Sequence, residues 1–598
     1  MQYLILRLCH WKHASCFLVM LLLLTACTTA PPSAPTTEAP TPSAEVAATE
    51  RGMGGTLRLV YFQAPTLLNP HLAGNIKDLE ASRITYEPLA SFDSAGQLVP
   101  FLAAEIPSVE NGDVAADGRS VTWRLHADVR WSDGEPFTAD DVVFTYEYIT
   151  NPDVPAAFAG LYTSVSRVEA LDDHTVQITF AQPTASWWLP FVGSPGMILP
   201  RHIFEQYNGL NADDAPANLL PVGTGPYIVD SFQPQEVIFL ATDLVRTYRI
   251  VYVPNPYFRD PDKPYFARIE LRGGGTSGVA IRAVMEEGSA DYAWNPQVSP
   301  EEVRELEANG IGSILTSFES RIHFLQLNFT DPQRGSSPAF PNPIFEDKRV
   351  RQAFAYAINR ERIAEEVYGV LGQPEDDYLL TPDYYKSPEI LYTYDKARAR
   401  ALLEAAGWVD TNGDGIREKD GTTLRVVYHV PVNPQYQEIQ QIVADELRSI
   451  GFDVERVLRD PNDFFGDPAL TNSWIRFNAD IAGAGWLSNS PDPVPHMAYW
   501  TCSDIPTAEN GWTGFNISRW CNESYDELLT EASTELDEER REQMFMQLND
   551  MLIEDVAFVT LVQIARVAAV SNTLQGVDLT PWDVDTWNIQ DWRRSSTP

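Results

Sequence analysis

The chain is short of basic residues, cysteine and histidine, and each shortage argues against a class of function. It carries 43 Lys and Arg against 83 Asp and Glu, which gives a formal net charge of −40. An acidic chain repels phosphate backbones and anionic lipid headgroups, so nucleic acid is not an expected partner. The 5 Cys and 9 His show no Cys-x-x-Cys or Cys/His zinc spacing. We therefore expect no cofactor.

Catalytic signatures are missing as well. The sequence has no His-Glu-x-x-His pair and no nucleophile elbow. Residues 223–227 (Gly-Thr-Gly-Pro-Tyr) lack the Lys-Ser/Thr of a phosphate-binding loop and are interpreted as a turn. Because 83 acidic residues create chance carboxylate pairs, no pair can be assigned to glycosidase chemistry. We expect that the protein is not an enzyme.

No apolar run of the sequence is long enough to span a bilayer. The run Phe17–Leu24 follows a positively charged stretch, the pattern of a secretory signal. Residues Leu24–Cys27 (Leu-Thr-Ala-Cys) resemble a bacterial lipobox, which implies a signal peptide over 1–26, cleavage before Cys27 and lipidation of Cys27. A plain signal peptide with an incidental Cys is the alternative. Residues 27–53, rich in Pro, Thr, Ala and Ser, are predicted to form a tether.

The rest of the chain is too long for one hydrophobic core and alternates helices with strands. With 598 residues, 44% apolar content and 15 Trp, it is expected to form two or three globular domains. Alternating apolar residues predict strands at 57–61 and 120–125. Helices are predicted after the capping residues Thr138 (with Asp141), Asp347 and Asp395, and over 435–450 and 525–555. Strands at 558–562 and 567–570 follow, and the alternation favours the α/β class.

Several stretches, taken in chain order, resemble one protein family. They are Asp117–Arg119, Trp131–Phe144, Gly223–Tyr227, Asn255–Phe258, Phe345–Phe354 and Ala405–Trp408. From about Gly54 to the end, the chain resembles the extracytoplasmic solute-binding proteins of ABC importers, in the peptide/nickel-binding family 5. The order of these independent motifs makes the resemblance specific.

The resemblance implies an α/β fold with two lobes, of the type II periplasmic-binding-protein class, with an extra N-terminal subdomain. The expected segments are 54–320 for lobe I, with the subdomain at about 71–215, then 321–562 for lobe II and 563–598 for the return to lobe I. The chain is expected to cross between the lobes near 315–325 and 560–570. The lobes would close on a small solute, and the closed protein would dock on an ABC permease and its ATPase. We expect an extracytoplasmic monomer that meets the membrane only through its lipid anchor.

The resemblance also indicates ligand-binding residues. Peptide-binding members carry Trp-x-x-Asp, whose Asp pairs with the peptide ammonium; here Trp486 is present, Asn489 stands at the fourth position, and the nearest carboxylate is Asp492. Dipeptide binders carry Arg-Pro-Tyr-Asn-Pro, whose Arg takes the peptide carboxylate; here the stretch is Val430–Pro434. The candidate ligand-binding residues are Tyr61, Val430, Val432, Asn433, Trp486, Asn489, Asp492, Tyr499 and Trp500.

Neutral residues thus stand where the family places both charge partners of a peptide. Because a buried charge without its partner is strongly destabilised, a short zwitterionic peptide is disfavoured. A longer or capped peptide is favoured, with an oligosaccharide stacked on Trp486 and Trp500 as the alternative. A secreted hydrolase or a sensor domain is the alternative from another class.

Residues 410–418 resemble the first half of an EF-hand loop. Asp410, Asn412 and Asp414 supply oxygen ligands at positions 1, 3 and 5, and a Gly stands at position 6. Position 12 is Gly421, where a bidentate Glu is needed. A turn held by Asx hydrogen bonds is the first interpretation, and weak calcium binding is the alternative.

Cys502 and Cys521 are the two cysteines outside the leader. In an oxidising compartment they can pair across a short loop. The chain-entropy model assigns such a bridge about 3 kcal/mol of stabilisation.

Overall fold

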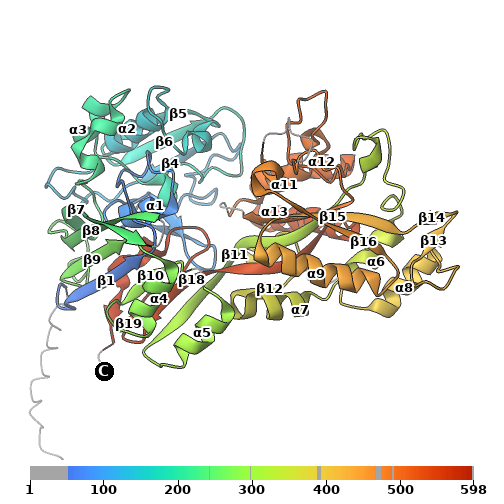
Figure 1. Ribbon diagram of the computed structural model, residues 1–598. Coiled ribbons are helices and arrows are strands. Elements are labelled where there is room, and N and C mark those ends of the chain that lie inside the picture. The colour runs from blue at the N-terminus through green and yellow to red at the C-terminus, as the bar shows by residue number, and fades with distance from the viewer. Residues whose placement is uncertain are drawn as a thin grey trace, which may run out of the picture. The chain divides into compact units, whose positions relative to one another are not determined.

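A computed structural model describes residues 51–240, 243–296, 298–386, 392–466, 473–487 and 491–595. Its main element is a mixed sheet of 11 strands (Figure 1). In spatial order the path is β16 (Asp453–Arg459), β15 (Arg425–Pro431), β17 (Ile481–Leu487), β11 (Gly312–Leu327), β18 (Phe558–Ser571), β10 (Tyr292–Trp294), β1 (Thr56–Tyr61), β9 (Arg268–Gly273), β8 (Asp243–Pro254) and β7 (Tyr227–Leu240), with β12 (Gly372–Pro374) paired to β18. This mixed sheet with flanking helices agrees with the expected α/β class.

The long strands β11 and β18 belong to two hydrophobic cores. They pair antiparallel along most of their length and lie side by side in Figure 1. Leu315 of β11 packs against the core around β1, whereas Leu325 lies in the core around β15 and β17. The pair occupies the segments 315–325 and 560–570 at which the chain was expected to cross. We call β11 and β18 the hinge strands; the lobe boundaries themselves stay a prediction.

The prediction of two separate strands at 558–562 and 567–570 is wrong. β18 is one continuous strand. Its partner β11 supplies backbone hydrogen bonds on both sides of the expected gap, and β12 pairs with residues 562–564 inside it. Continuous pairing therefore overrides the weak apolar pattern of the middle residues.

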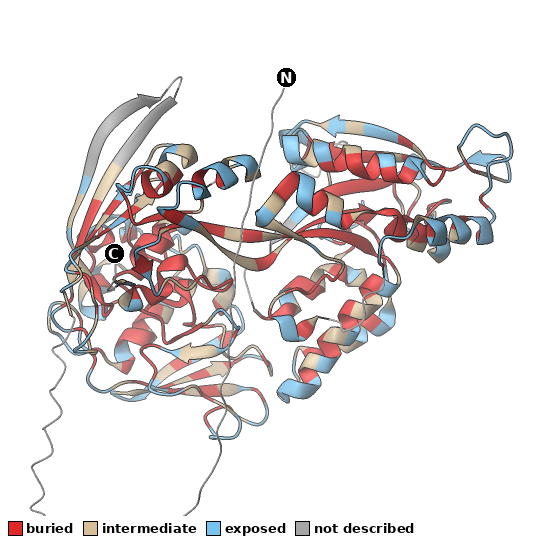
Figure 2. Cartoon of the chain, turned by 90° about the horizontal axis from the view of Figure 1, so that it is seen from below, coloured by how far each residue is buried: buried red, intermediate tan, exposed pale blue. Residues whose placement is uncertain are grey.

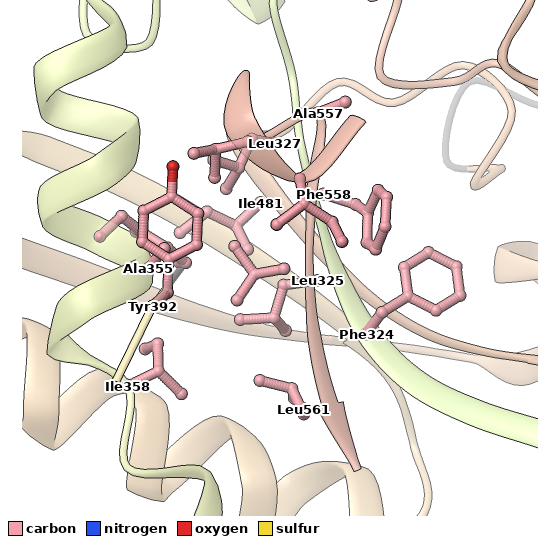
Figure 3. Close-up of a cluster of buried hydrophobic side chains, with 14 of the residues drawn as sticks. Phe324, Leu325, Leu327, Ala355, Ile358, Tyr392, Ile481, Ala557, Phe558 and Leu561 are labelled. Atoms are coloured by element: carbon pink, nitrogen blue, oxygen red, sulfur yellow. The ribbon is translucent and has the colours of Figure 1, made fainter. Parts of the chain in front are cut away.

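The core at the β15–β17 end of the sheet is formed by apolar side chains of the hinge strands, β17 and the helix α6. Figure 3 shows part of it, and its labelled residues are Phe324, Leu325, Leu327, Ala355, Ile358, Tyr392, Ile481, Ala557, Phe558 and Leu561. The described helices show buried residues on one side and exposed residues on the other (Figure 2). This amphipathic division is what holds the helices on the sheet.

The segment expected to form an extra subdomain has a hydrophobic cluster of its own. It draws on residues between Ala73 and Ala217, joined by Trp582 and Val584 from the end of the chain. A three-stranded antiparallel sheet lies in this segment, in the order β4 (Ser120–Arg124), β6 (Thr175–Phe180) and β5 (Val165–Asp172).

The predicted capping residues begin helices as expected. Asp141 accepts the N–H of Thr138 at 3.0 Å and closes a capping box on α2 (Ala139–Thr150). Asp347 and Asp395 accept backbone N–H groups at the starts of α6 (Lys348–Ala357) and α8 (Lys396–Ala405). The helix predicted at 435–450 is α9 (Pro434–Arg448). These predictions are confirmed.

The single helix predicted over 525–555 is wrong. The chain forms α12 (Glu523–Ala532) and α13 (Glu538–Glu554), with a turn between them. Asp537 starts the second helix by accepting the N–H of Arg540 at 2.8 Å. The Ser533 carbonyl in the turn accepts the N–H of Ala185 at 3.1 Å, so a contact from a distant part of the chain holds the break.

The remaining helices and strands are short. They are α1 (Ile76–Arg83), β2 (Ala90–Phe92), β3 (Leu98–Pro100), α3 (Arg201–Phe204), α4 (Ser277–Met285), α5 (Pro300–Glu307), α7 (Arg360–Ile363), β13 (Glu418–Lys419), β14 (Thr422–Thr423), α10 (Pro461–Phe464), α11 (Pro493–Met497), β19 (Leu574–Gln575) and β20 (Arg593–Arg594). Among the residues that the structure describes, no helix has the length and apolar character needed to cross a bilayer.

Candidate functional site

A cavity of about 750 Å³ borders the hinge strands. Its walls come from the segment between β10 and α5, from β11 and β18, from the first turn of α9 and from β17. This volume lies in the range of small-molecule sites. The lining includes Glu302, Arg321, His323, Tyr368, Tyr436 and Gly485. We call it the hinge cavity.

Strand geometry directs two polar side chains of β11 toward the hinge cavity. The β11–β18 register shifts at residues 318–322, which is the signature of a β-bulge. Arg321 and His323 lie two residues apart on the strand, so their side chains leave on the same face. His323 lies opposite Gly485 of β17. Because Gly485 has no side chain, the space beside His323 stays open; a Cβ there would lie 3.1 Å from the Tyr436 hydroxyl.

His323 is a buried and uncharged part of the cavity wall. Its Nδ1 shares a hydrogen bond with the Tyr368 hydroxyl, and its ring lies edge-on to Tyr436 with the centroids 4.2 Å apart. Burial lowers the pKa of His323 to about 3, so the ring stays neutral at physiological pH. In the described part of the chain, Nε2 has no hydrogen-bond partner.

Arg321 is the cation of the cavity wall. Its guanidinium lies 2.9 Å from a carboxylate oxygen of Glu319, and the other oxygen of Glu319 lies 3.4 Å from Nε of Arg566. Arg566 also contacts Asp585 at 3.3 Å. Burial lowers the pKa of Arg566, but the Asp585 and Glu319 carboxylates more than offset this and hold the pKa above its usual value. Glu319 is therefore shared by two guanidinium groups, and the charge of Arg321 is only partly neutralised.

A second cavity, of about 430 Å³, lies between the subdomain segment and α13. Its lining includes Trp187, Trp188, Tyr384, Tyr385, Glu538 and Arg541. We call it the aromatic cavity. Pro491 of the stretch that follows β17 also lines it.

Asp492, next to Pro491, is committed to the protein's own structure. It begins α11 by accepting the N–H of Val494 at 3.1 Å. It pairs with Arg541 of α13 at 2.7 Å and accepts the Ser186 hydroxyl. The residue is 1% exposed, so its charge is satisfied inside the protein. The structure places Asp492 in a buried ion pair, and its role toward a ligand ammonium stays a prediction.

With this geometry in view, the comparison with known families is decisive. The model of the bacterial extracellular solute-binding proteins, family 5, matches residues 97–506. The chain belongs to this family. It is a family of binding proteins and not of enzymes.

Curated relatives match over nearly their whole length. The oligopeptide-binding protein AppA of Bacillus subtilis is 24% identical over 558 residues, which cover 92% of this chain and 93% of the relative. The di/tripeptide-binding protein 1 of Pseudomonas aeruginosa is 22% identical over 578 residues, covering 91% and 96%.

Solved structures share the fold. AppA of B. subtilis in complex with a nonapeptide matches with a TM-score of 0.59 at 22% identity, covering 92% of this chain and all of that one. The murein tripeptide binding protein MppA in its unliganded open form matches with a TM-score of 0.72 at 20% identity, covering 92% and 99%. The two-lobe, type II binding-protein fold is thereby confirmed.

Three members of the predicted ligand set are enclosed in hydrophobic cores, and their ligand role stays a prediction. Trp500 is 3% exposed, and its ring lies edge-on to Tyr378 at 5.4 Å. Val430 is fully buried in β15. Tyr61 is fully buried at the end of β1, with its ring 5.4 Å from Trp294.

The structure also describes three further members of the predicted ligand set. Asn433 caps α9 by accepting the N–H of Tyr436 at 3.2 Å, and Val432 beside it is half exposed. The ring of Tyr499 lies edge-on to Phe515 at 4.9 Å. None of Asn433, Val432 and Tyr499 lines the hinge cavity.

The stretch that contains Trp486 and Asn489 is described only in part. Trp486 is placed in β17 opposite Ile322 of β11, next to the cavity-lining Gly485. Asn489 lies outside the described residues, as does Cys27. The ligand roles of Trp486 and Asn489 and the lipidation of Cys27 stay predictions.

Residues 410–418 form a turn held by internal hydrogen bonds. Asp410 accepts the N–H groups of Gly413 at 2.6 Å and Gly415 at 3.0 Å, and these bonds lower the pKa of Asp410. Asn412 accepts the N–H of Asp414 at 2.8 Å. The oxygen atoms considered for calcium are therefore used by the turn, as the first interpretation expected.

The two cysteines outside the leader are bonded to each other. Cys502 and Cys521 form a disulfide with Cα atoms 4.7 Å apart and a sequence separation of 19. The bridge closes the segment between α11 and the start of α12. It lies outside the lining of both cavities, so its role is structural.

Sequence reasoning missed the residues that line the hinge cavity. Arg321 and His323 stand in the segment expected to cross between lobes, and their spacing of two residues on a strand was a usable signal. Tyr436 gave no such signal, because its place in the wall depends on how α9 packs beside β17.

Proposed function

We propose that the protein is the receptor of an ABC importer, which captures a peptide-like solute in the hinge cavity and delivers it to a membrane permease and its ATPase. Membership of the solute-binding family supports this function, and relatives across the whole chain length are named oligopeptide- and di/tripeptide-binding proteins. The observation that carries the assignment is the position of the cavity, which is walled by both hinge strands and by elements of both cores.

This position explains how binding could change the protein. A ligand in the cavity contacts β17 and α9 on one side and the β10–α5 segment on the other. Such a ligand stabilises the state in which both sides of the cavity contact it. A permease that binds this state preferentially then selects the ligand-bound protein.

A peptide fits the cavity better than an oligosaccharide. The sugar alternative relied on two stacking rings, Trp486 and Trp500, and Trp500 is enclosed in the core. A peptide can instead pair with the backbone of a strand, and Gly485 of β17, which lines the cavity, lies beyond Ile481 and Ala482, the residues that pair with β15.

We further propose that Cys27 carries the lipid and that the protein acts as a monomer on the outer face of the membrane. The Leu-Thr-Ala-Cys sequence before residue 28 supports the anchor. Mass spectrometry of the membrane-extracted protein tests it: a diacylglycerol adduct on a chain that begins at Cys27 is expected, and a chain with an unmodified Cys27 contradicts it.

The ligand class is tested by thermal shift and calorimetry. Tri- to hexapeptides should raise the unfolding midpoint and linear oligosaccharides should not; a shift with sugars alone overturns the peptide assignment. Gly485→Val places a side chain in the cavity beside Tyr436 and should weaken peptide binding. Gly74→Val is the matched control, since Gly74 is exposed and a Cβ added there meets nothing within 4 Å.

A further inference from the structure

We propose that the hinge cavity binds a carboxylate of its ligand through Arg321, and that it takes peptides with a free acid end without requiring a free amino end. This inference rests on the proposed peptide function and names the ligand chemistry of the same cavity. It follows from a charge inventory of the described residues that line the cavity.

Arg321 is the charged cation of that lining. The one other basic side chain there, His323, is neutral because burial lowers its pKa to about 3. The Arg321 side chain is 36% exposed, so its guanidinium is accessible from the cavity. A guanidinium has five N–H donors in a planar fork that matches a carboxylate. The contact with Glu319 at 2.9 Å is an ion pair in which that Glu319 oxygen accepts no hydrogen bond from the described residues.

The counter-charge of Arg321 is divided. Glu319 is 2% exposed and is held between Arg321 and Arg566, while Arg566 also contacts Asp585. The two guanidinium groups and the two carboxylates of this group balance one another before a ligand binds. A ligand carboxylate at Arg321 would add a third acidic group there, while Glu319 keeps its contact with Arg566 at 3.4 Å.

A ligand ammonium finds no equivalent partner in the same lining. Glu302 is the one carboxylate there, and it lies 2.8 Å from the guanidinium of Arg282. Arg282 also contacts Glu286 at 2.9 Å, so Glu302 shares its counter-charge, but Glu302 does accept a hydrogen bond from Arg282. Asp492, the carboxylate nearest to the family's ammonium position, pairs with Arg541.

The bulge in β11 accounts for this arrangement. In a regular antiparallel ladder, residues 319 and 321 would point to the same face. The register shift at residues 318–322 frees this segment from regular pairing, so that Glu319 lies buried beside Arg566 while Arg321 lines the cavity. The sequence Glu-Ser-Arg at the bulge is therefore what brings a cation to the ligand.

Calorimetry with one hexapeptide in four forms tests the proposal: free, N-acetylated, C-amidated, and modified at both ends. For the wild-type protein, amidation should weaken binding on the order of 10- to 100-fold, the range of a charge-assisted hydrogen bond. Acetylation should change it by less than about 3-fold. An amidated peptide that ends in Glu distinguishes the two sources of the anion: recovered affinity assigns it to a side-chain carboxylate, and unrecovered affinity to the chain terminus.

Arg321→Gln should bind the free and amidated peptides equally, and Arg321→Lys should keep part of the preference because it keeps the charge. Arg304→Gln is the control, since Arg304 is 62% exposed on α5 and does not line the cavity. Unfolding midpoints of all three variants establish that they fold.

The outcomes distinguish a failure of this inference from a failure of the proposed peptide function. Tight binding of all four peptides with equal affinity overturns the carboxylate site and leaves the peptide function standing. Loss of affinity on acetylation instead of amidation also overturns it. Binding of none of the peptides overturns the peptide function and the inference together.

Discussion

Asp492→Asn decides whether this carboxylate stabilises the protein or binds the ligand. Asn caps a helix about as well as Asp, so α11 keeps its cap. Arg541 loses its counter-charge, and its other contacts are the Ala532 carbonyl at 3.0 Å and the Phe545 ring at 4.9 Å. Its side chain is 10% exposed, so water reaches it only from the aromatic cavity that it lines and replaces the carboxylate in part. Removing one partner of such a buried pair costs about 3–5 kcal/mol.

That free energy corresponds to a measurable shift of the unfolding midpoint. At about 2.1 cal/mol/K of unfolding entropy per residue, roughly 550 folded residues give about 1.2 kcal/mol/K. The midpoint should therefore fall by about 3–4 °C if the chain unfolds as one unit. If the core that contains α13, roughly 240 residues, unfolds by itself, the fall is about 6–10 °C.

Differential scanning calorimetry measures this shift, and Arg540→Ala is the matched control. Arg540 neighbours Arg541 on α13 but is 59% exposed, and its pair with Glu531 lies on the surface. Such pairs contribute at most about 1 kcal/mol. An Asp492→Asn protein with an unchanged midpoint and an altered preference for free amino termini would refute the structural role and restore the ligand role.

Three further substitutions probe other features. Replacing Cys502 and Cys521 by Ser should cost about 3 kcal/mol in urea denaturation, and a reductant should then affect only the wild type, given the separation of 19 residues. Burial and the neighbouring Glu375 raise the pKa of Asp377 to about 7, so the stability that Asp377 contributes is full below about pH 4 and is lost as pH rises through 7. Asp377→Asn should remove this fall in the free energy of unfolding, which amounts to at most about 4 kcal/mol. An unchanged pH profile in the variant would contradict this. Trp486→Ala should abolish the ligand-induced thermal shift without lowering the midpoint of the free protein, and unchanged binding would remove Trp486 from the site.

The sequence predicted helix starts correctly where the capping contact joins residues that are close in the chain. A cap such as Asp347 or Asp395 bonds a backbone N–H two or three residues away, so the sequence contains both partners. The start of α13 has the same local signal, since Asp537 accepts the N–H of Arg540. The Ser533 carbonyl in the turn before it bonds the distant Ala185, and the continuity of β18 depends on β11 and β12. Those partners are distant in sequence, and no window of neighbouring residues reveals them.

The candidate site was likewise predicted in part. The resemblance led to the right neighbourhood, since Gly485 lines the hinge cavity beside the predicted Trp486. It did not separate cavity residues from core residues, because Trp500 and Val430 are buried by packing that only the fold defines. Arg321 reaches the cavity through a bulge, and a bulge is set by pairing between distant strands.

Hydrogen exchange of the protein with and without a bound hexapeptide tests most directly whether the hinge cavity is the ligand site. Backbone amides at 319–323 of β11, 435–437 of α9 and 483–487 of β17 should gain protection, because these segments form its walls. Amides at 185–188 and 535–542, which border the aromatic cavity, should change little. Protection at the aromatic cavity with none at the hinge strands, α9 and β17 would contradict the assignment.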